Sequence, residues 1–199
     1  MDKGILSDRE KALENNYFRQ EEARLLQKLR QNANLDDIAV ALRDMLHVDN
    51  SELLMRVREL GVTAETAPAF FLAPLVMVAW AREPVTKAER EMVLRLARER
   101  DVAVDSTSYA QLRQWLEVRP PDALFEASLD VLRYTFAVLP PVEREERISR
   151  VVEWCQKVAE TSGSQIATLL GLREDVNRAE ESAVATINER LRIGTRAAS

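Results

Sequence analysis

The chain has 199 residues, of which 46% are hydrophobic and 31% charged, a composition typical of a soluble globular protein. The formal net charge of −5 argues against nucleic acid or an anionic membrane as the main partner, because the overall field would repel both. The single cysteine, Cys155, excludes an intramolecular disulfide and a cysteine-based metal cluster, and it fits a reducing cytoplasm. Few glycines and prolines disfavour a hairpin-rich β fold.

Helix formers bounded by capping residues predict three helices in the first part of the chain. They cover residues 7–30, 35–46 and 51–60. Ser7 and Glu10 have the spacing of a capping box, and Asn50 can cap the third helix, with Gly61 as its C-terminal stop. Residues 62–67 are the best candidate linker, so we expect one domain over residues 1–61 and a second over residues 62–199.

Prolines, caps and apolar spacing predict six further helices. The first three cover residues 68–82, 86 to about 100, and 109–116. The fourth follows Pro120-Pro121 and runs to residue 139, the fifth contains residues 148–155 and stops before Ser162, and the sixth runs from about residue 173 to 191. Ser106 or Ser108 caps the third of these. The most apolar run, residues 69–81, is short of the ~20 residues that span a bilayer, so we interpret it as a buried core helix. The fold class expected is all-α.

Several runs between residues 64 and 191 follow the pattern of a known helical domain. They read L-A-P-L-V-M-V-A-W-A, V-T-K-A-E-R, S-Y-A-Q-L-R-Q-W-L-E-V-R-P, L-P-P-V-E-R-E, V-A-E-T-S-G and R-A-E-E. This region resembles the TerB-like domain, which is named for a tellurite-resistance protein. The resemblance implies a TerB-like helical bundle preceded by an N-terminal helical arm.

The acidic residues that form the metal site of the TerB-like family are only partly kept here. Arg82 and Glu83 stand where the family has an Asp-Gly pair, whereas Thr86 and Glu89 match it. A cation in place of a carboxylate opposes metal binding, because hard divalent ions need several oxygen ligands. We therefore expect neither a metal nor another cofactor, and we interpret Thr86 and Glu89 as a capping box.

The run from Arg9 to Arg19 reads R-E-K-A-L-E-N-N-Y-F-R and places two aromatic residues side by side in a polar helix. Residues 9–30 resemble the small helical inhibitors of the F-type ATP synthase, which fold on binding and insert between its catalytic subunits. The partner contacts that this resemblance implies are Glu14, Tyr17, Phe18, Arg19, Leu26, Leu29 and Arg30. The His-rich coiled coil of that family is absent, since His47 is the only histidine.

Two interpretations of Tyr17 and Phe18 stay open. They can anchor the segment in a groove of a partner, or they can pack back on the helical domain. Glu21 and Glu22 interrupt the apolar stripe of this helix, which favours the partner.

Other candidate residues have structural interpretations that we prefer. His47 lies near Asp44 and Asp49 but has no nucleophile in a recognisable motif, so a helix-end histidine is favoured over a general base. Cys155 has core-like spacing, which predicts a buried, inert thiol. The three tryptophans are expected in the core; they are Trp80, Trp115 and Trp154.

Two clusters of charged residues remain. Glu143 to Arg147 reads E-R-E-E-R, which predicts a solvated first helical turn rather than an acid–base or metal site. Four arginines between residues 90 and 100 can form a patch for an acidic partner, but the nearby Glu89, Glu91 and Glu99 dilute its charge.

These observations predict a non-catalytic regulatory or interaction protein of the cytoplasm. Its N-terminal amphipathic helix is expected to dock on a partner protein, and the resemblance names ATP synthase as the candidate. We expect no catalytic residue, no nucleic-acid partner and no transmembrane segment. The alternatives are a TerB-like stress-response protein associated with a divalent metal or a membrane complex, and an unrecognised enzyme.

Overall fold

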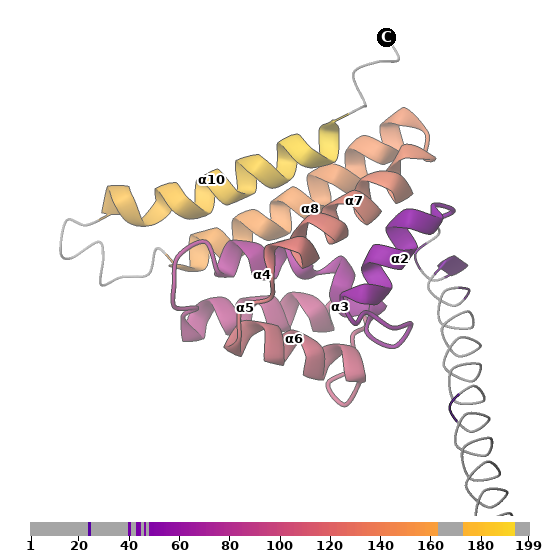
Figure 1. The fold of residues 1–199 in the computed structure, drawn as a ribbon. Coiled ribbons are helices and arrows are strands. Elements are labelled where there is room, and N and C mark those ends of the chain that lie inside the picture. The colour runs from indigo at the N-terminus through magenta and orange to yellow at the C-terminus, as the bar shows by residue number, and fades with distance from the viewer. Residues whose placement is uncertain are drawn as a thin grey trace, which may run out of the picture. The chain divides into compact units, whose positions relative to one another are not determined.

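The structure is a computed structural model that describes residues 24, 40, 43, 44, 46, 48–162 and 173–193. The chain divides into two compact units, Met1–Val40 and Ala41–Ser199. The described helices of the second unit are α2 (Ser51–Glu59), α3 (Ala67–Phe71), α4 (Ala73–Ala79), α5 (Lys87–Arg98), α6 (Thr107–Glu117), α7 (Asp122–Ala137), α8 (Pro141–Ser162) and α10 (Arg173–Arg192) (Figure 1). These residues contain no strand, which confirms the all-α fold for the described part of the chain.

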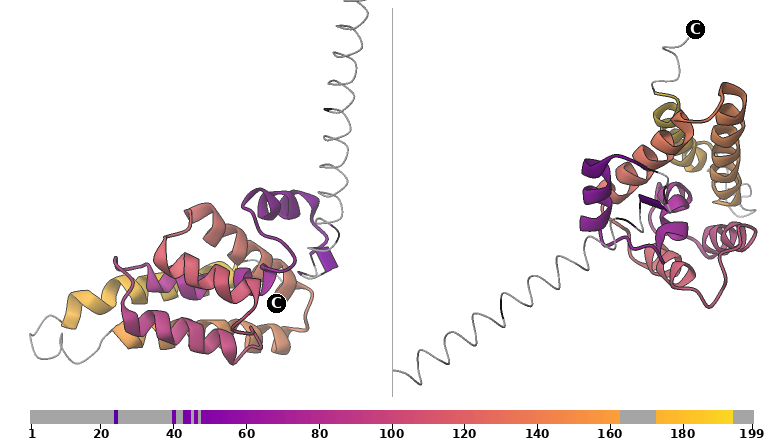
Figure 2. Two further views of the ribbon diagram at one scale, coloured as in Figure 1. Left: turned by 90° about the horizontal axis from the view of Figure 1, so that it is seen from below. Right: turned by 90° about the vertical axis from the view of Figure 1, so that its right-hand side faces the viewer.

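The predicted helices over residues 7–30 and 35–46 lie outside the described residues, apart from isolated positions. The boundary predicted between residues 61 and 62 stays a prediction. Within the second unit, α2 packs against α7 at the margin of the bundle (Figure 2).

Helix α4 lies at the centre of the second unit. All of its residues but Met77 are buried, and it packs against α5, α6, α7, α8 and α10. A helix that is apolar on every side is stable only when other elements surround it. The interpretation of this apolar run as buried core is therefore confirmed.

The single helix predicted from residue 68 to residue 82 is wrong, because the chain forms two helices that meet at Leu72. Pro74 causes the break. It has no N–H to donate to the carbonyl of Phe70, four residues earlier, and its ring would collide with that carbonyl in a continuous helix. The helix therefore ends at Phe71 and restarts at Ala73.

Two buried serine hydroxyls bond the backbone of the short helix α3. The Ser128 hydroxyl, from α7, donates to the Phe70 carbonyl at 2.8 Å. The Ser108 hydroxyl, from α6, donates to the Glu65 carbonyl at 2.7 Å and accepts from the Ala69 N–H at 3.3 Å. These hydroxyls form hydrogen bonds with backbone groups that cannot all be paired within a five-residue helix. They therefore hold α3 against α6 and α7.

Most of the predicted caps are present. The Asn50 side chain accepts from the Leu53 N–H, and Gly61 follows α2 with a φ of +78°. Thr86 and Glu89 form a complete capping box on α5. The sequence offered Ser106 and Ser108 as caps of α6. Ser106 is the cap, whereas the Ser108 side chain is buried and bonds the backbone at α3, as described above.

Side chains at the ends of the helices hold α7, α8 and α10 together. Arg144 donates to the carbonyls of Phe136, Ala137 and Leu139, and thereby closes the turn between α7 and α8. Glu145 accepts two hydrogen bonds from Arg192 of α10, one of them at 2.6 Å. These bonds lower the pKa of the Glu145 carboxyl.

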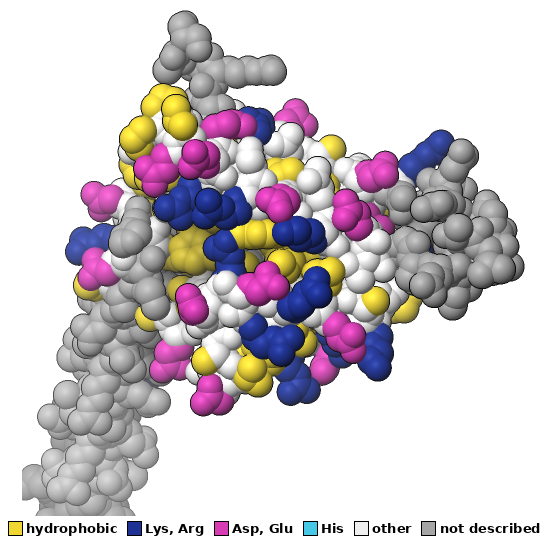
Figure 3. Space-filling model, turned by 180° about the vertical axis from the view of Figure 1, so that it is seen from behind, with side chains coloured by type: hydrophobic (Ala, Val, Ile, Leu, Met, Phe, Trp, Pro, Cys, Tyr) yellow, Lys and Arg dark blue, Asp and Glu magenta, His cyan; other side chains and the backbone are white. Residues whose placement is uncertain are grey.

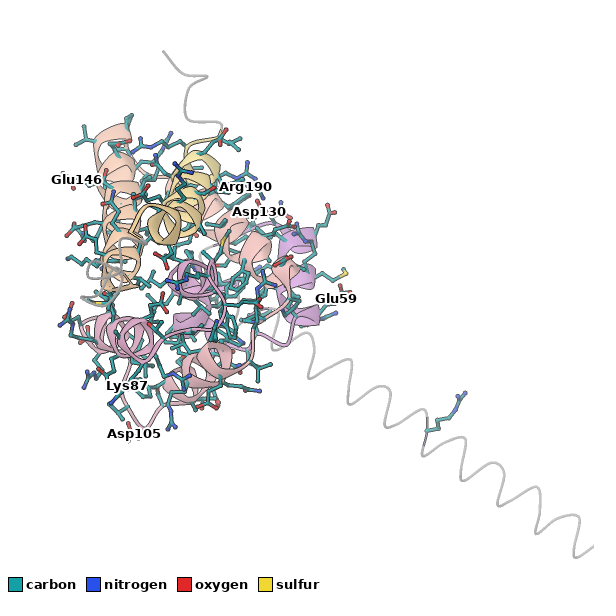
Figure 4. The ribbon with its side chains drawn as sticks, turned by 90° about the vertical axis from the view of Figure 1, so that its left-hand side faces the viewer. Glu59, Lys87, Asp105, Asp130, Glu146 and Arg190 are labelled. Carbon is teal, nitrogen blue, oxygen red and sulfur yellow. The ribbon has the colours of Figure 1, made fainter. Side chains whose placement is uncertain are left out.

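A second charged contact joins three helices at Asp130 of α7. Its carboxylate lies 3.4 Å from Arg56 of α2 and 3.7 Å from Arg190 of α10. Figure 4 shows Asp130 of α7 and Arg190 of α10 close together. Because both arginines are partly exposed, each pair contributes little stability, about 0–1 kcal/mol.

We predict that Ser128→Ala destabilises the protein by about 1–3 kcal/mol, because it removes a donor from the buried Phe70 carbonyl. Guanidinium unfolding of the full chain, followed by circular dichroism, measures this difference. Ser182→Ala on the exposed face of α10 is the control and should change stability by less than about 0.5 kcal/mol. Equal effects of the two substitutions would contradict the role assigned to the Ser128 hydroxyl.

Candidate functional site

The best candidate site in the described residues is a pocket between α3, the end of α5, α7 and α8. It has a volume of about 300 Å³, and we call it the arginine pocket. Its walls are formed by Pro68, Phe71, Leu72, Arg100, Val102, Leu132, Phe136, Arg147, Arg150, Val151 and Trp154. The space-filling view from behind shows hydrophobic side chains in a hollow, with basic and some acidic side chains around it (Figure 3).

The floor of the arginine pocket is apolar and firmly held. Leu132 and Phe136 reach it from α7, and Val151 reaches it from α8, and all three are buried. Phe71 and Leu72 lie at the break between α3 and α4, so the interruption caused by Pro74 is what brings them to the pocket. The floor is therefore built on packed helices, apart from this one short turn.

Arg100 and Trp154 form one side of the pocket. The Cζ atom of Arg100 lies 3.2 Å from the centre of the Trp154 ring, a close cation–π contact. Arg100 is held by the turn that ends α5, in which Asp101 has a φ of +61°. The Val102 N–H donates to the Ala97 carbonyl across this turn. A left-handed residue with this bond is a common way to end a helix, and here it directs Arg100 and Val102 to the pocket.

Three guanidinium groups line the arginine pocket. Burial, together with repulsion from Arg150 and Arg147, lowers the pKa of Arg100, although an arginine stays protonated at any physiological pH. Arg147 has an exposed partner in Glu143, at 3.4 Å. Arg150 has no ion pair within the described part of the chain. The pocket is thus a local concentration of positive charge in a chain whose net charge is negative.

The partner-binding residues predicted from the sequence lie outside the described residues. They are Glu14, Tyr17, Phe18, Arg19, Leu26, Leu29 and Arg30. The same is true of His47, so its assignment as a helix-end residue stays a prediction.

The residues at the TerB-like metal positions have structural contacts. The Thr86 N–H donates to a carboxylate oxygen of Glu89 at 2.6 Å, and the Glu89 N–H donates to the Thr86 hydroxyl at 3.2 Å. Arg82 is exposed, and Glu83 lies 3.9 Å from Arg119. Among the described residues, no group of three His, Cys, Asp or Glu side chains is placed to hold a metal ion.

The charged cluster at the start of α8 is more ordered than predicted. It is not merely a solvated turn, since Arg144 caps α7, Glu145 bonds to α10 and Arg147 reaches the pocket. The core position predicted for the tryptophans holds for Trp115, whereas Trp154 is half-buried beside the pocket. Trp80 is also half-buried, and its indole N–H donates to the Trp115 carbonyl at 2.7 Å.

Sequence reasoning missed the arginine pocket because its residues are distributed over four segments. One signal was present: Arg147, Arg150 and Trp154 follow the three- and four-residue spacing of a single helix face. Nothing in the sequence placed Arg100 beside them, since that contact depends on how α5 packs against α8.

Cys155 is a buried thiol, as predicted. Burial raises its pKa to about 12, so the thiolate needed for nucleophilic chemistry or metal binding is scarce near neutral pH.

Comparisons of the chain with protein-family models, with curated proteins and with solved structures gave no match. The resemblances to the TerB-like domain and to the ATP synthase inhibitors therefore stay predictions. Each helix in the described part of the chain is too short or too polar to cross a membrane.

We predict that Cys155 of the folded protein reacts with Ellman's reagent at pH 8 at least roughly a hundredfold more slowly than in guanidinium. Burial blocks the thiol and raises its pKa, and unfolding returns the pKa to about 8.5. The control is an exposed thiol on the same helix, Ser149→Cys combined with Cys155→Ala, which should react quickly in both conditions. Rapid labelling of Cys155 in the folded protein would show that α8 opens in solution.

Proposed function

We propose that this chain is a non-catalytic interaction protein whose N-terminal segment docks on a partner protein. The observation that carries the proposal is the Arg9–Arg19 run, in which Tyr17 and Phe18 stand together in a mostly polar run of helix formers. Two adjacent aromatic residues supply a large apolar contact area, and the surrounding charges can fix the register of the segment on its partner.

The division of the chain supports this proposal. Residues 41–199 form a compact unit of their own, whose core is built around α4 and includes Phe70, Leu75 and Leu112. Tyr17 and Phe18 belong to the other unit, Met1–Val40. The aromatic pair can therefore be altered with little expected cost to the helical unit.

The resemblance to the small ATP synthase inhibitors supplies a candidate partner. In that mode of action the segment would bury Tyr17, Phe18, Leu26 and Leu29 between catalytic subunits. Arg19 and Arg30 would then pair with acidic groups of the enzyme. The mechanism is steric, because an inserted helix prevents the movement of subunits that hydrolysis requires.

We predict that Tyr17→Ala combined with Phe18→Ala abolishes docking, because anchors of this kind each contribute about 2 kcal/mol or more. The immobilised full chain and this variant are compared as baits in lysate, with bound proteins identified by mass spectrometry. A purified ATP synthase catalytic sector then tests the named target through its rate of ATP hydrolysis. The melting temperature of the variant should stay within roughly 2 °C of the parent.

Asn15→Ala combined with Asn16→Ala is the matched control, since it alters two polar positions next to the aromatic pair. This control should retain both the partner and any inhibition of hydrolysis. A large fall in melting temperature for the aromatic variant would instead assign Tyr17 and Phe18 to the protein core. If the parent, the aromatic variant and the asparagine variant all retain the same partners, the docking surface does not include Tyr17 and Phe18.

A further inference from the structure

We propose that the arginine pocket binds a small organic anion that combines an apolar body with a carboxylate or phosphate head group. This inference rests on residues of the second compact unit and is independent of the N-terminal docking proposed above. Nothing in the chain's resemblances assigns a ligand to this place.

The shape and lining of the pocket suit the apolar part of such a ligand. Its volume of about 300 Å³ is at the lower end of the range for small-molecule sites. Leu132, Val151 and Phe136 are each less than 10% exposed, so they form a rigid wall rather than a mobile surface. An apolar chain or ring placed against them would leave water without displacing any buried side chain.

The charges of the pocket suit the anionic part. Arg100, Arg147 and Arg150 are at the walls of one small cavity, although like charges repel each other there. Of these three, only Arg147 has an ion pair among the described residues, and that pair with Glu143 is exposed. A carboxylate or phosphate would reduce the repulsion and accept several charge-assisted hydrogen bonds from guanidinium groups.

The arrangement also discriminates against other occupants. An organic cation would meet three positive groups, and a neutral apolar molecule would gain nothing from them. A protein surface would need a broader contact than a cavity of this volume, because stable protein interfaces bury about 800 Å² on each partner. Arg100 already lies over one face of Trp154, so that face is not available for stacking a flat ring.

The test is a calorimetric titration of the full chain with decanoate and with decyl phosphate at low salt. These two probes distinguish the head groups, and decanol serves as the neutral probe with the same chain length. The variant is Arg147→Met combined with Arg150→Met, which removes two charges and keeps most of each apolar stem. The control is Arg82→Met combined with Arg113→Met, which removes two exposed charges outside the pocket and gives the same net charge.

We expect at least one anionic probe to bind the parent and the control equally well. The pocket variant should bind this anion at least tenfold more weakly than the parent does. The parent should bind decanol at least tenfold more weakly than it binds the anion. Added salt should reduce the affinity for the anion, because it screens the guanidinium groups. Circular dichroism should show the same melting curve for the variant and the control, since all four arginines are exposed.

Three results would overturn the proposal. The first is the absence of binding of both anionic probes up to about 1 mM, which corresponds to a negligible affinity. The second is equal affinity of the parent and the pocket variant for the anion, which would place binding elsewhere. The third is tighter binding of an acidic peptide with one phenylalanine than of either amphiphile, which would assign the pocket to a protein partner.

Discussion

The missing backbone donor at Pro74 is the constraint on which the rest of the helical unit depends. It divides an apolar run, which could otherwise have formed one long helix, into α3 and α4. The break leaves polar backbone groups in a region that excludes water, and buried groups of this kind must find partners. The Ser128 hydroxyl, from α7, supplies a partner for the Phe70 carbonyl, and the Ser108 hydroxyl, from α6, bonds the Ala69 N–H near the start of α3. The break in this apolar run is thus linked to α7 through the Ser128 hydroxyl.

The same break determines where the arginine pocket forms. Phe71 and Leu72, at the turn between α3 and α4, lie at the floor of the cavity. Helices α7 and α8 supply the remaining apolar wall, and the Arg144 side chain closes the turn between them. The apolar floor of the pocket is therefore built on buried residues of packed helices, whereas its arginines are exposed.

The distribution of charge explains how an acidic protein can present a basic site. Several arginines of the described helices have a carboxylate nearby, as Arg56 and Arg190 have in Asp130. The pocket differs because its guanidinium groups are close to one another and to Trp154. Long-range attraction of anions is weak for a chain with a net charge of −5, so selectivity must come from this short-range arrangement.

The sequence by itself determined the all-α class and the starts of α2 and α5, and it limited the cap of α6 to Ser106 or Ser108, because a cap is a contact between residues three positions apart. Asn50, the pair of Thr86 and Glu89, and Ser106 all act over that distance. Only the tertiary structure decided the partners of the broken helix and the composition of the pocket. The Ser128 hydroxyl meets a carbonyl 58 residues away, and Arg100 meets Trp154 across two helices. Such contacts depend on how the helices pack against each other. Helical periodicity indicates which face of a helix is apolar, but not which other helix packs on that face.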